Sequence, residues 1–170
     1  MAVAMNPVVV MVLGIETSCD DTAAAVVKAG HTVLSSVSTN QDVFHERYGG
    51  IVPEIASRRH VELLSAAIED ALDRARVTLR DVGGIAVTAG PGLVGSLVVG
   101  VASAKALAFA ASKPLFAINH LHGHIFAAFL DVDVEPTYPL LAANLRARRD
   151  NLVATIGMLE RRATSTSEAA

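Results

Sequence analysis

The sequence predicts an α/β fold in which helices pack on a mixed β-sheet, with the element order βββαβαβα. Three observations support this expectation. Short apolar segments separated by tight turns fill the first part of the chain, and helical and strand-like segments then alternate. Of the 170 residues, 52% are apolar and only 18% are charged, so the chain can bury a core and is not expected to be disordered.

The first three elements are expected to be strands at residues 8–16, 22–28 and 32–38. Each segment is rich in small or branched apolar residues, which favour strands. Ala29-Gly30 supplies a turn between the second and third segments, so the three strands are expected to be antiparallel. Residues 41–50 are polar and end in glycine, and they predict a loop.

The second half alternates helices and strands. A helix is expected over residues 53–76, because proline fits the first helical position and apolar residues then recur with a helical period. Short buried strands are expected at 85–88 and 115–118. The segment between them, residues 93–111, predicts a helix that is apolar nearly all round and therefore buried.

Composition and charge give no support for several classes of protein. The net charge is −3 with no basic stripe before the C-terminal tail, so nothing supports a nucleic-acid surface. Cys19 is the only cysteine, which excludes an intrachain disulfide and favours a reducing compartment. No positive segment precedes the apolar N-terminus, and Lys105 interrupts the longest apolar stretch. We expect a cytoplasmic protein without a membrane span.

Two histidines at the start of the last expected helix suggest a metal site. His120 and His124 are four residues apart, so their rings share one helix face and can converge on one cation. Two imidazoles fill half of a tetrahedral shell, so further ligands must come from elsewhere. A zinc-protease motif requires a glutamate between the histidines, but Leu121 and His122 occupy those places.

An acidic turn follows the first strand and carries Glu16, Asp20 and Asp21. Carboxylates at a strand end can position hydrated Mg²⁺ or act as a general base. Asp and Ser are equally common in turns that have no function, so the pattern alone leaves both interpretations open.

A glycine segment links the fourth expected strand to the following helix. Gly90, Gly92 and Gly95 satisfy G-x-G-x-x-G, but no acidic residue follows within about 20 positions to hold a ribose, which counts against dinucleotide binding. No Gly-Lys-Ser/Thr follows, which excludes a P-loop. Two interpretations remain: a cradle of backbone N–H groups for an anion, or a turn that lets helix and strand pack closely.

Four segments, LGIETSCDDT, YGGIVPEIASRRH, TAGPGLVGSL and NHLHGH, resemble the N-terminal lobe of the tRNA threonylcarbamoyladenosine transferases. This family is TsaD in bacteria and was formerly called O-sialoglycoprotein endopeptidase or glycoprotease. The resemblance implies a ribonuclease-H-like lobe of the sugar-kinase/actin-like (ASKHA) fold. It also implies transfer of threonylcarbamoyl from threonylcarbamoyl-adenylate to N6 of adenosine 37 in tRNA.

The resemblance also implies roles for individual residues. His120 and His124 would bind a divalent metal, Fe²⁺ first and Zn²⁺ or Mg²⁺ as alternatives, and Asp20 and Asp21 would be catalytic, with Asp20 the more important. Substrate-binding roles would fall to a further group: Glu16, Gly90, Gly92 and Gly95. The implied partners are tRNA, a homologous non-catalytic TsaB-like subunit and an ATPase subunit, with no membrane.

The chain also departs from the family pattern. Asp21 stands where the family usually has glutamate, and His122 stands where glutamate is common. The family's second lobe, which supplies an aspartate as third metal ligand, has no counterpart in this sequence. We therefore expect an extension at 1–10, a lobe at 11–141, an atypical tail at 142–170 and an incomplete site. The alternatives are a non-catalytic dimerisation module and, more weakly, a metalloprotease.

Overall fold

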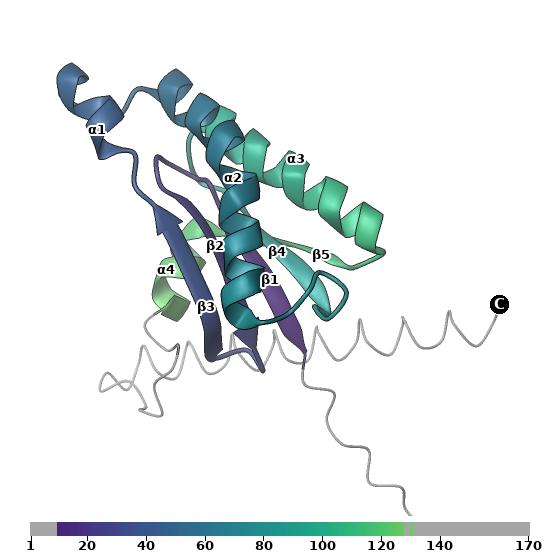
Figure 1. Cartoon of the computed structure of the whole chain (residues 1–170). Helices are drawn as coiled ribbons and strands as arrows, with labels where there is room; N and C mark the ends of the chain where they lie inside the picture. Colours follow the sequence, from purple (N-terminus) through teal and green to yellow (C-terminus); the bar gives the residue numbers. More distant parts are fainter. Residues whose placement is uncertain (1–9, 128–129, 131–170) are drawn as a thin grey trace, which may run out of the picture. The chain divides into compact units, whose positions relative to one another are not determined.

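The computed structural model describes residues 10–127 and residue 130, and these residues form one mixed five-stranded sheet with helices packed on it (Figure 1). The elements in chain order are β1 Met11–Glu16, β2 Thr22–Lys28, β3 Thr32–Thr39, α1 Asp42–His45, a 3₁₀ turn Glu46–Tyr48, α2 Pro53–Ala75, β4 Gly84–Gly90, α3 Val94–Ala111, β5 Leu115–Asn119 and α4 His120–Ala127. The predicted order βββαβαβα is confirmed, with one short helix added. The predicted boundary at 141/142 lies outside the described residues.

The sheet has the strand order β3-β2-β1-β4-β5. β1 pairs antiparallel with β2, and β2 pairs antiparallel with β3, as the tight turns predicted. β4 lies parallel to β1, with Leu13 opposite Ile85, and β5 lies parallel to β4. The carboxyl ends of β1, β4 and β5 therefore meet at one edge of the sheet, where α/β proteins commonly place their functional groups.

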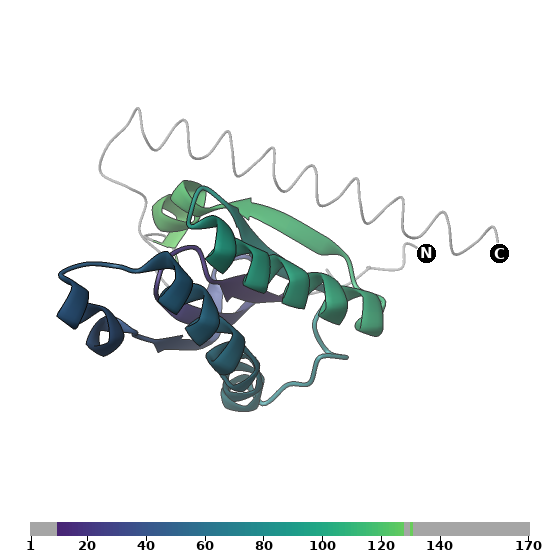
Figure 2. The ribbon, with the colours of Figure 1, turned by 90° about the horizontal axis from the view of Figure 1, so that it is seen from above.

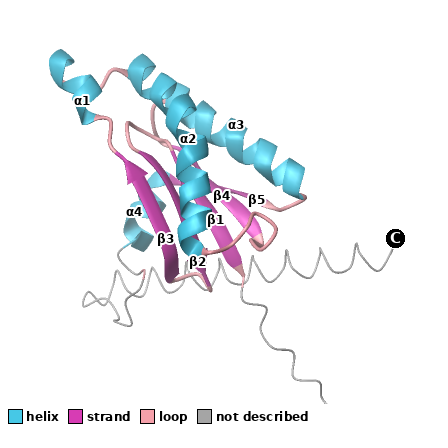
Figure 3. Cartoon of the chain, viewed as in Figure 1, coloured by secondary structure: helices cyan, strands magenta, loops and turns pink. Residues whose placement is uncertain are grey.

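Helices α2 and α3 lie side by side over one face of the sheet (Figures 2 and 3). Alternate residues of β1, β2 and β4 point towards the helices. Because these residues are aliphatic, the core between the helices and the sheet is aliphatic. Its most deeply buried members include Leu13, Val26, Ala71, Ile85 and Ala104. Residues such as Glu16 and Thr88 alternate with these core residues, which places their side chains on the opposite face.

The expectation that residues 41–50 form a plain loop is wrong. An Asx-type turn begins the segment: the backbone N–H of Asp42 donates to Asn40 Oδ1 at 2.6 Å, and the N–H of Phe44 donates to the carbonyl of Gln41 at 2.9 Å. These bonds start the single turn of α1, which the polar composition did not reveal.

The expectation that the helix at 93–111 is buried all round is also wrong. Only one stripe of α3 is buried, and it consists of small residues four apart: Ser96, Gly100, Ala104 and Ala108. The other side is open, with Val94 77%, Val98 60% and Phe109 90% exposed. By length and composition alone, α3 could cross a membrane, with a mean hydropathy of 1.8 over its 18 residues. Here it packs on β4 and α2.

Candidate functional site

The residues predicted to be functional gather at the carboxyl ends of the three parallel strands. The turn of residues 17–21 follows β1, the glycine segment follows β4, and the histidines follow β5. Asn119 fixes the start of α4, because its Oδ1 accepts the backbone N–H groups of Leu121 at 3.0 Å and His122 at 3.3 Å. This is an N-cap, and it holds the first turn that carries the histidines.

The two imidazoles converge as their spacing predicted. His120 Nε2 and His124 Nε2 lie 3.0 Å apart, and the rings meet edge to face at 82° with centroids 4.4 Å apart. Without an ion, one of these nitrogens must carry the proton that the other accepts. The arrangement thus presents two ring nitrogens to one point in space.

The inner nitrogen of His120 meets a polar cage at the end of β1. His120 Nδ1 lies 3.0 Å from Ser18 Oγ and 3.3 Å from Glu16 Oε2. The Glu16 carboxylate also accepts hydrogen bonds from the backbone N–H of Ser18 and from the Thr88 hydroxyl. Partial burial raises the pKa of Glu16, but the hydrogen bonds from Ser18, Thr88 and His120 outweigh it and hold that pKa below its usual value.

This cage fits a metal-binding histidine. A ligating imidazole commonly donates its second N–H to a carboxylate, which fixes the tautomer and turns the other lone pair towards the metal. Within residues 10–127 and 130, however, no group of three His, Cys, Asp or Glu side chains could hold a metal ion. Among the described residues, His120 and His124 could therefore offer two nitrogen ligands to such an ion, and its other positions would fall to other groups.

Asp20 belongs to a different part of the turn. It lines an open pocket of about 250 Å³ that faces α1, together with five other residues: Asp42, His45, Glu46, Gly50 and Ile51. Asp20 is half-buried, whereas the neighbouring Asp21 is exposed. It is Glu16, rather than Asp20 or Asp21, that contacts the histidine pair through a hydrogen bond.

The pKa of the Asp21 carboxyl group is raised above its usual value. Desolvation by neighbouring groups raises it most, the negative charges of Asp20 and Asp42 raise it further, and His60 opposes the shift. A raised pKa makes a carboxylate a stronger base.

The glycine segment is packed against the acidic turn. A Cβ on Gly92 would lie 2.5 Å from the carbonyl oxygen of Ser18, and a Cβ on Gly95 would lie 3.3 Å from Ser57. Gly90 has φ +150°, a backbone conformation that favours glycine. Close packing therefore explains Gly92 and Gly95, and backbone conformation explains Gly90. A role in substrate binding stays a prediction for all three.

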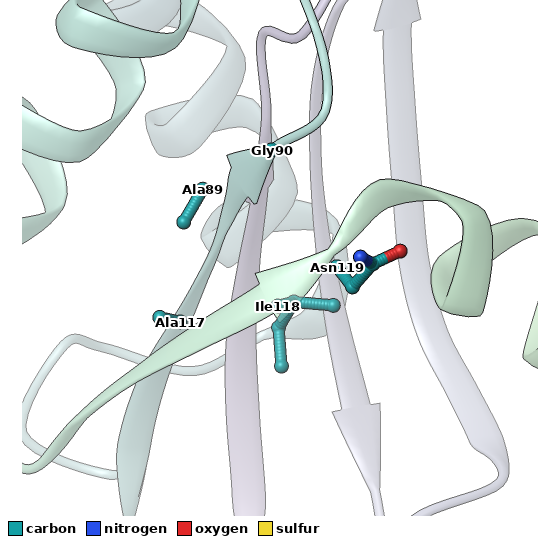
Figure 4. A pocket seen from close by; sticks show the side chains of 5 residues that line it. All are labelled: Ala89, Gly90, Ala117, Ile118 and Asn119. Atoms are coloured by element: carbon teal, nitrogen blue, oxygen red, sulfur yellow. The ribbon is translucent and has the colours of Figure 1, made fainter.

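Gly90 also lines a second open pocket, of about 230 Å³, at the ends of β4 and β5 (Figure 4). Its other lining residues are Ala89, Ala117, Ile118 and Asn119. Apart from Asn119, whose Oδ1 caps α4, these side chains are apolar or absent. A ligand in this pocket would therefore find mainly apolar walls and few polar contacts.

Sequence reasoning missed the residues that hold the acidic turn in place. The Thr17 hydroxyl donates to the carbonyl of Ser96 at 2.8 Å, and the Ser96 hydroxyl donates to the carbonyl of Cys19 at 3.1 Å. The backbone N–H of Leu93 donates to the carbonyl of Ser18 at 2.7 Å. The first turn of α3 and the turn after β1 are therefore one hydrogen-bonded unit.

His60 of α2 completes this support and was also missed. It is fully buried, with Nε2 3.1 Å from the carbonyl of Cys19 and Nδ1 2.8 Å from the Thr22 hydroxyl. Because a carbonyl can only accept, Nε2 carries the proton and Nδ1 accepts the hydroxyl. The only available signal was a histidine on the apolar face of the predicted helix.

Comparison with known proteins identifies the family. A family model described as TsaD, tRNA N6-adenosine threonylcarbamoyltransferase, matches residues 32–169. This match runs past Leu141, the last residue of the predicted lobe. A protein of that name from Symbiobacterium thermophilum is 51% identical over 147 residues, which cover 86% of this chain and 43% of the relative. The Geobacillus kaustophilus protein of that name is 54% identical over 144 residues, covering 85% and 42%.

The chain thus spans about two fifths of the length of these relatives. Among solved structures, YeaZ from Pseudomonas aeruginosa matches with a TM-score of 0.52 and 22% identity, covering 70% of this chain and 49% of that one. An uncharacterized protein with similarity to peptidase YeaZ, also from P. aeruginosa, matches with a TM-score of 0.54 and 25% identity, covering 74% and 50%.

The predicted α/β class with a ribonuclease-H-like lobe is confirmed by the mixed five-stranded sheet and by the fold match to YeaZ. The family is shown by sequence, since the model match covers most of the chain and the relatives share half of their aligned residues. The chain belongs to the tRNA N6-adenosine threonylcarbamoyltransferase (TsaD) family.

Proposed function

We propose that this chain is the N-terminal lobe of an enzyme that transfers threonylcarbamoyl from threonylcarbamoyl-adenylate to N6 of adenosine 37 in tRNA. One observation carries the proposal: in a chain of this family, two imidazoles converge at the carboxyl edge of the sheet and are backed by a carboxylate. The lobe is taken to cover residues 11–141.

The reaction requires proton removal and a stabilised leaving group. The N6 amine of adenosine attacks the carbamoyl carbon, a new N–C bond forms, and the bond from that carbon to the phosphate oxygen breaks to release AMP. The amine loses a proton, which Asp20 or Asp21 would accept; the raised pKa of Asp21 suits that task. The glycine segment would shape the substrate side of the site.

A divalent ion would be held by His120 and His124, with Fe²⁺ proposed first and Zn²⁺ or Mg²⁺ as alternatives. When bound, the ion supplies Lewis-acid polarisation of the carbonyl or phosphate oxygen. The two imidazoles fit such an ion as a partial shell, and the remaining ligands would come from substrate, water or another part of the enzyme.

A metal titration tests the histidine site. The 170-residue chain should bind divalent ions weakly, and His120→Ala or His124→Ala should remove that binding, because each variant leaves a single imidazole. His31→Ala is the control, since His31 is exposed in the turn between β2 and β3. Isothermal titration with Zn²⁺ and Co²⁺ measures the effect. Binding that survives His120→Ala would refute the site, and tight stoichiometric binding would refute the partial shell.

The exposed face of α3 favours pairing with a homologous subunit. Three large apolar side chains lie open on it: Val94, Val98 and Phe109. The resemblance in fold to the YeaZ structures supports a TsaB-like partner that could lay a similar helix against this one. The second candidate function, a non-catalytic dimerisation module, rests on the same face.

Size-exclusion chromatography with a TsaB-like subunit tests this pairing. Val98→Asp should abolish co-elution, because a desolvated carboxylate at the centre of an apolar interface is strongly unfavourable. Val43→Asp is the control, since Val43 is also exposed, at 78% against 60% for Val98, but lies on α1. Equal loss with both variants, or no loss with Val98→Asp, would contradict the proposed face.

We further propose that tRNA and threonylcarbamoyl-adenylate are the substrates, that an ATPase subunit is a further partner, and that the protein is cytoplasmic. A tRNA transfer assay on the chain combined with its partners separates the enzyme from the dimerisation module. A metalloprotease is the weakest alternative, because no glutamate stands between His120 and His124.

A further inference from the structure

We propose that Glu16 is a positioning residue: its carboxylate holds His120 in the tautomer that carries the proton on Nδ1, so that the Nε2 lone pair faces the site. This inference rests on the proposed metal role of His120. It assigns Glu16 a task that acts through the histidine, in place of the direct substrate contact that the family resemblance implies.

The geometry brings the carboxylate to the correct atom. Glu16 Oε2 lies 3.3 Å from His120 Nδ1, while His120 Nε2 lies 3.0 Å from His124 on the other side of the ring. The ring therefore lies between a carboxylate and a second imidazole. A neutral imidazole has one donor and one acceptor nitrogen. A partner that can only accept, placed at Nδ1, therefore makes Nδ1 the donor and Nε2 the acceptor.

Glu16 is itself held in place. The Thr88 hydroxyl and the backbone N–H of Ser18 both donate to it, and Thr88 belongs to the neighbouring parallel strand β4. These bonds fix the rotamer of the side chain and leave Oε2 beside Nδ1. A carboxylate fixed in this way can orient an imidazole that lies beside it in space, although the two residues are 104 positions apart in sequence.

The Ser18 hydroxyl is closer to Nδ1, at 3.0 Å, but it cannot decide the tautomer. A hydroxyl donates or accepts equally well, whereas a carboxylate only accepts. If Nδ1 carried a lone pair, that lone pair would face Glu16 Oε2 and the two would repel. The Nδ1–H tautomer removes this repulsion and lets Nδ1–H be shared between Ser18 and Glu16.

The test reads the tautomer directly. Long-range ¹H–¹⁵N NMR correlations of the metal-free, ¹⁵N-histidine-labelled 170-residue chain, at about pH 8 where imidazoles are mostly neutral, should show Nδ1–H for His120. Glu16→Gln should move His120 to a mixture of tautomers, because the neutral amide can donate as well as accept. Glu69→Gln, an exposed carboxylate on α2, should change nothing.

Ser18→Ala keeps the test decisive even where Glu16→Gln fails to fold. That variant should retain Nδ1–H, because the carboxylate remains. Loss of Nδ1–H in Ser18→Ala, or its retention in a folded Glu16→Gln chain, would overturn the inference.

Metal affinity provides a second readout. Glu16→Gln should weaken Zn²⁺ or Co²⁺ binding by about 10- to 100-fold, the usual effect of losing an outer carboxylate. Unchanged affinity in Glu16→Gln together with lost affinity in His120→Ala would overturn the role of Glu16 and leave the metal site standing. A tautomer change without metal binding to any form of the chain would support Glu16 and refute the metal proposal.

Discussion

Replacing Gly92 by alanine is expected to lower the free energy of unfolding by about 3 kcal/mol. The new Cβ would lie 2.5 Å from the carbonyl oxygen of Ser18 and 2.8 Å from the Ser18 Cβ, so backbone atoms must move apart. That movement also breaks the 2.7 Å bond from the Leu93 N–H to the Ser18 carbonyl. Urea denaturation followed by circular dichroism measures the loss.

Gly50→Ala is the matched control, because no atom lies within 4 Å of a Cβ at that position. It should change the free energy of unfolding by no more than about 0.5 kcal/mol. If the two variants were equally stable, the close approach between the glycine segment and the acidic turn would not exist. The same result would remove the packing explanation for this part of the G-x-G-x-x-G pattern.

Truncating His60 should have a comparable or larger effect, a loss of about 4 kcal/mol in the free energy of unfolding. His60→Ala leaves a cavity in a fully buried place. It also removes the acceptor of the buried Thr22 hydroxyl, at 2.8 Å, and one of the two hydrogen-bond donors to the Cys19 carbonyl, at 3.1 Å; the Ser96 hydroxyl remains as the other donor. Buried polar groups that lose their partners keep the full penalty of desolvation.

Two measurements distinguish this support role from general packing. Urea denaturation gives the loss of stability, and His31→Ala, at an exposed turn, should be near neutral. Hydrogen exchange should show faster exchange of the Leu93 N–H in His60→Ala, because the turn of residues 17–21 loses one of its supports. Unchanged exchange at Leu93 would mean that His60 does not stabilise the turn.

Much of the architecture follows from local pattern. The boundaries of the second strand, Thr22–Lys28, were predicted to the residue, because an apolar run between two turns has little freedom. The α2 helix begins at Pro53 as expected, since proline fits the first helical turn. The errors are equally local in origin: Asn40 starts a helical turn in a polar segment, and the composition of α3 could not show which of its sides faces the sheet.

The sequence by itself determined the α/β class and the family. It also determined the convergence of His120 with His124, because two residues four positions apart on a helix lie on the same face. Only the tertiary structure decided which acid meets the histidines. Glu16, rather than Asp20 or Asp21, lies beside His120, and Ser18 and Thr88 join it. The physical reason is that parallel pairing of β1, β4 and β5 brings together side chains far apart in sequence, and no local periodicity records which strand ends become neighbours.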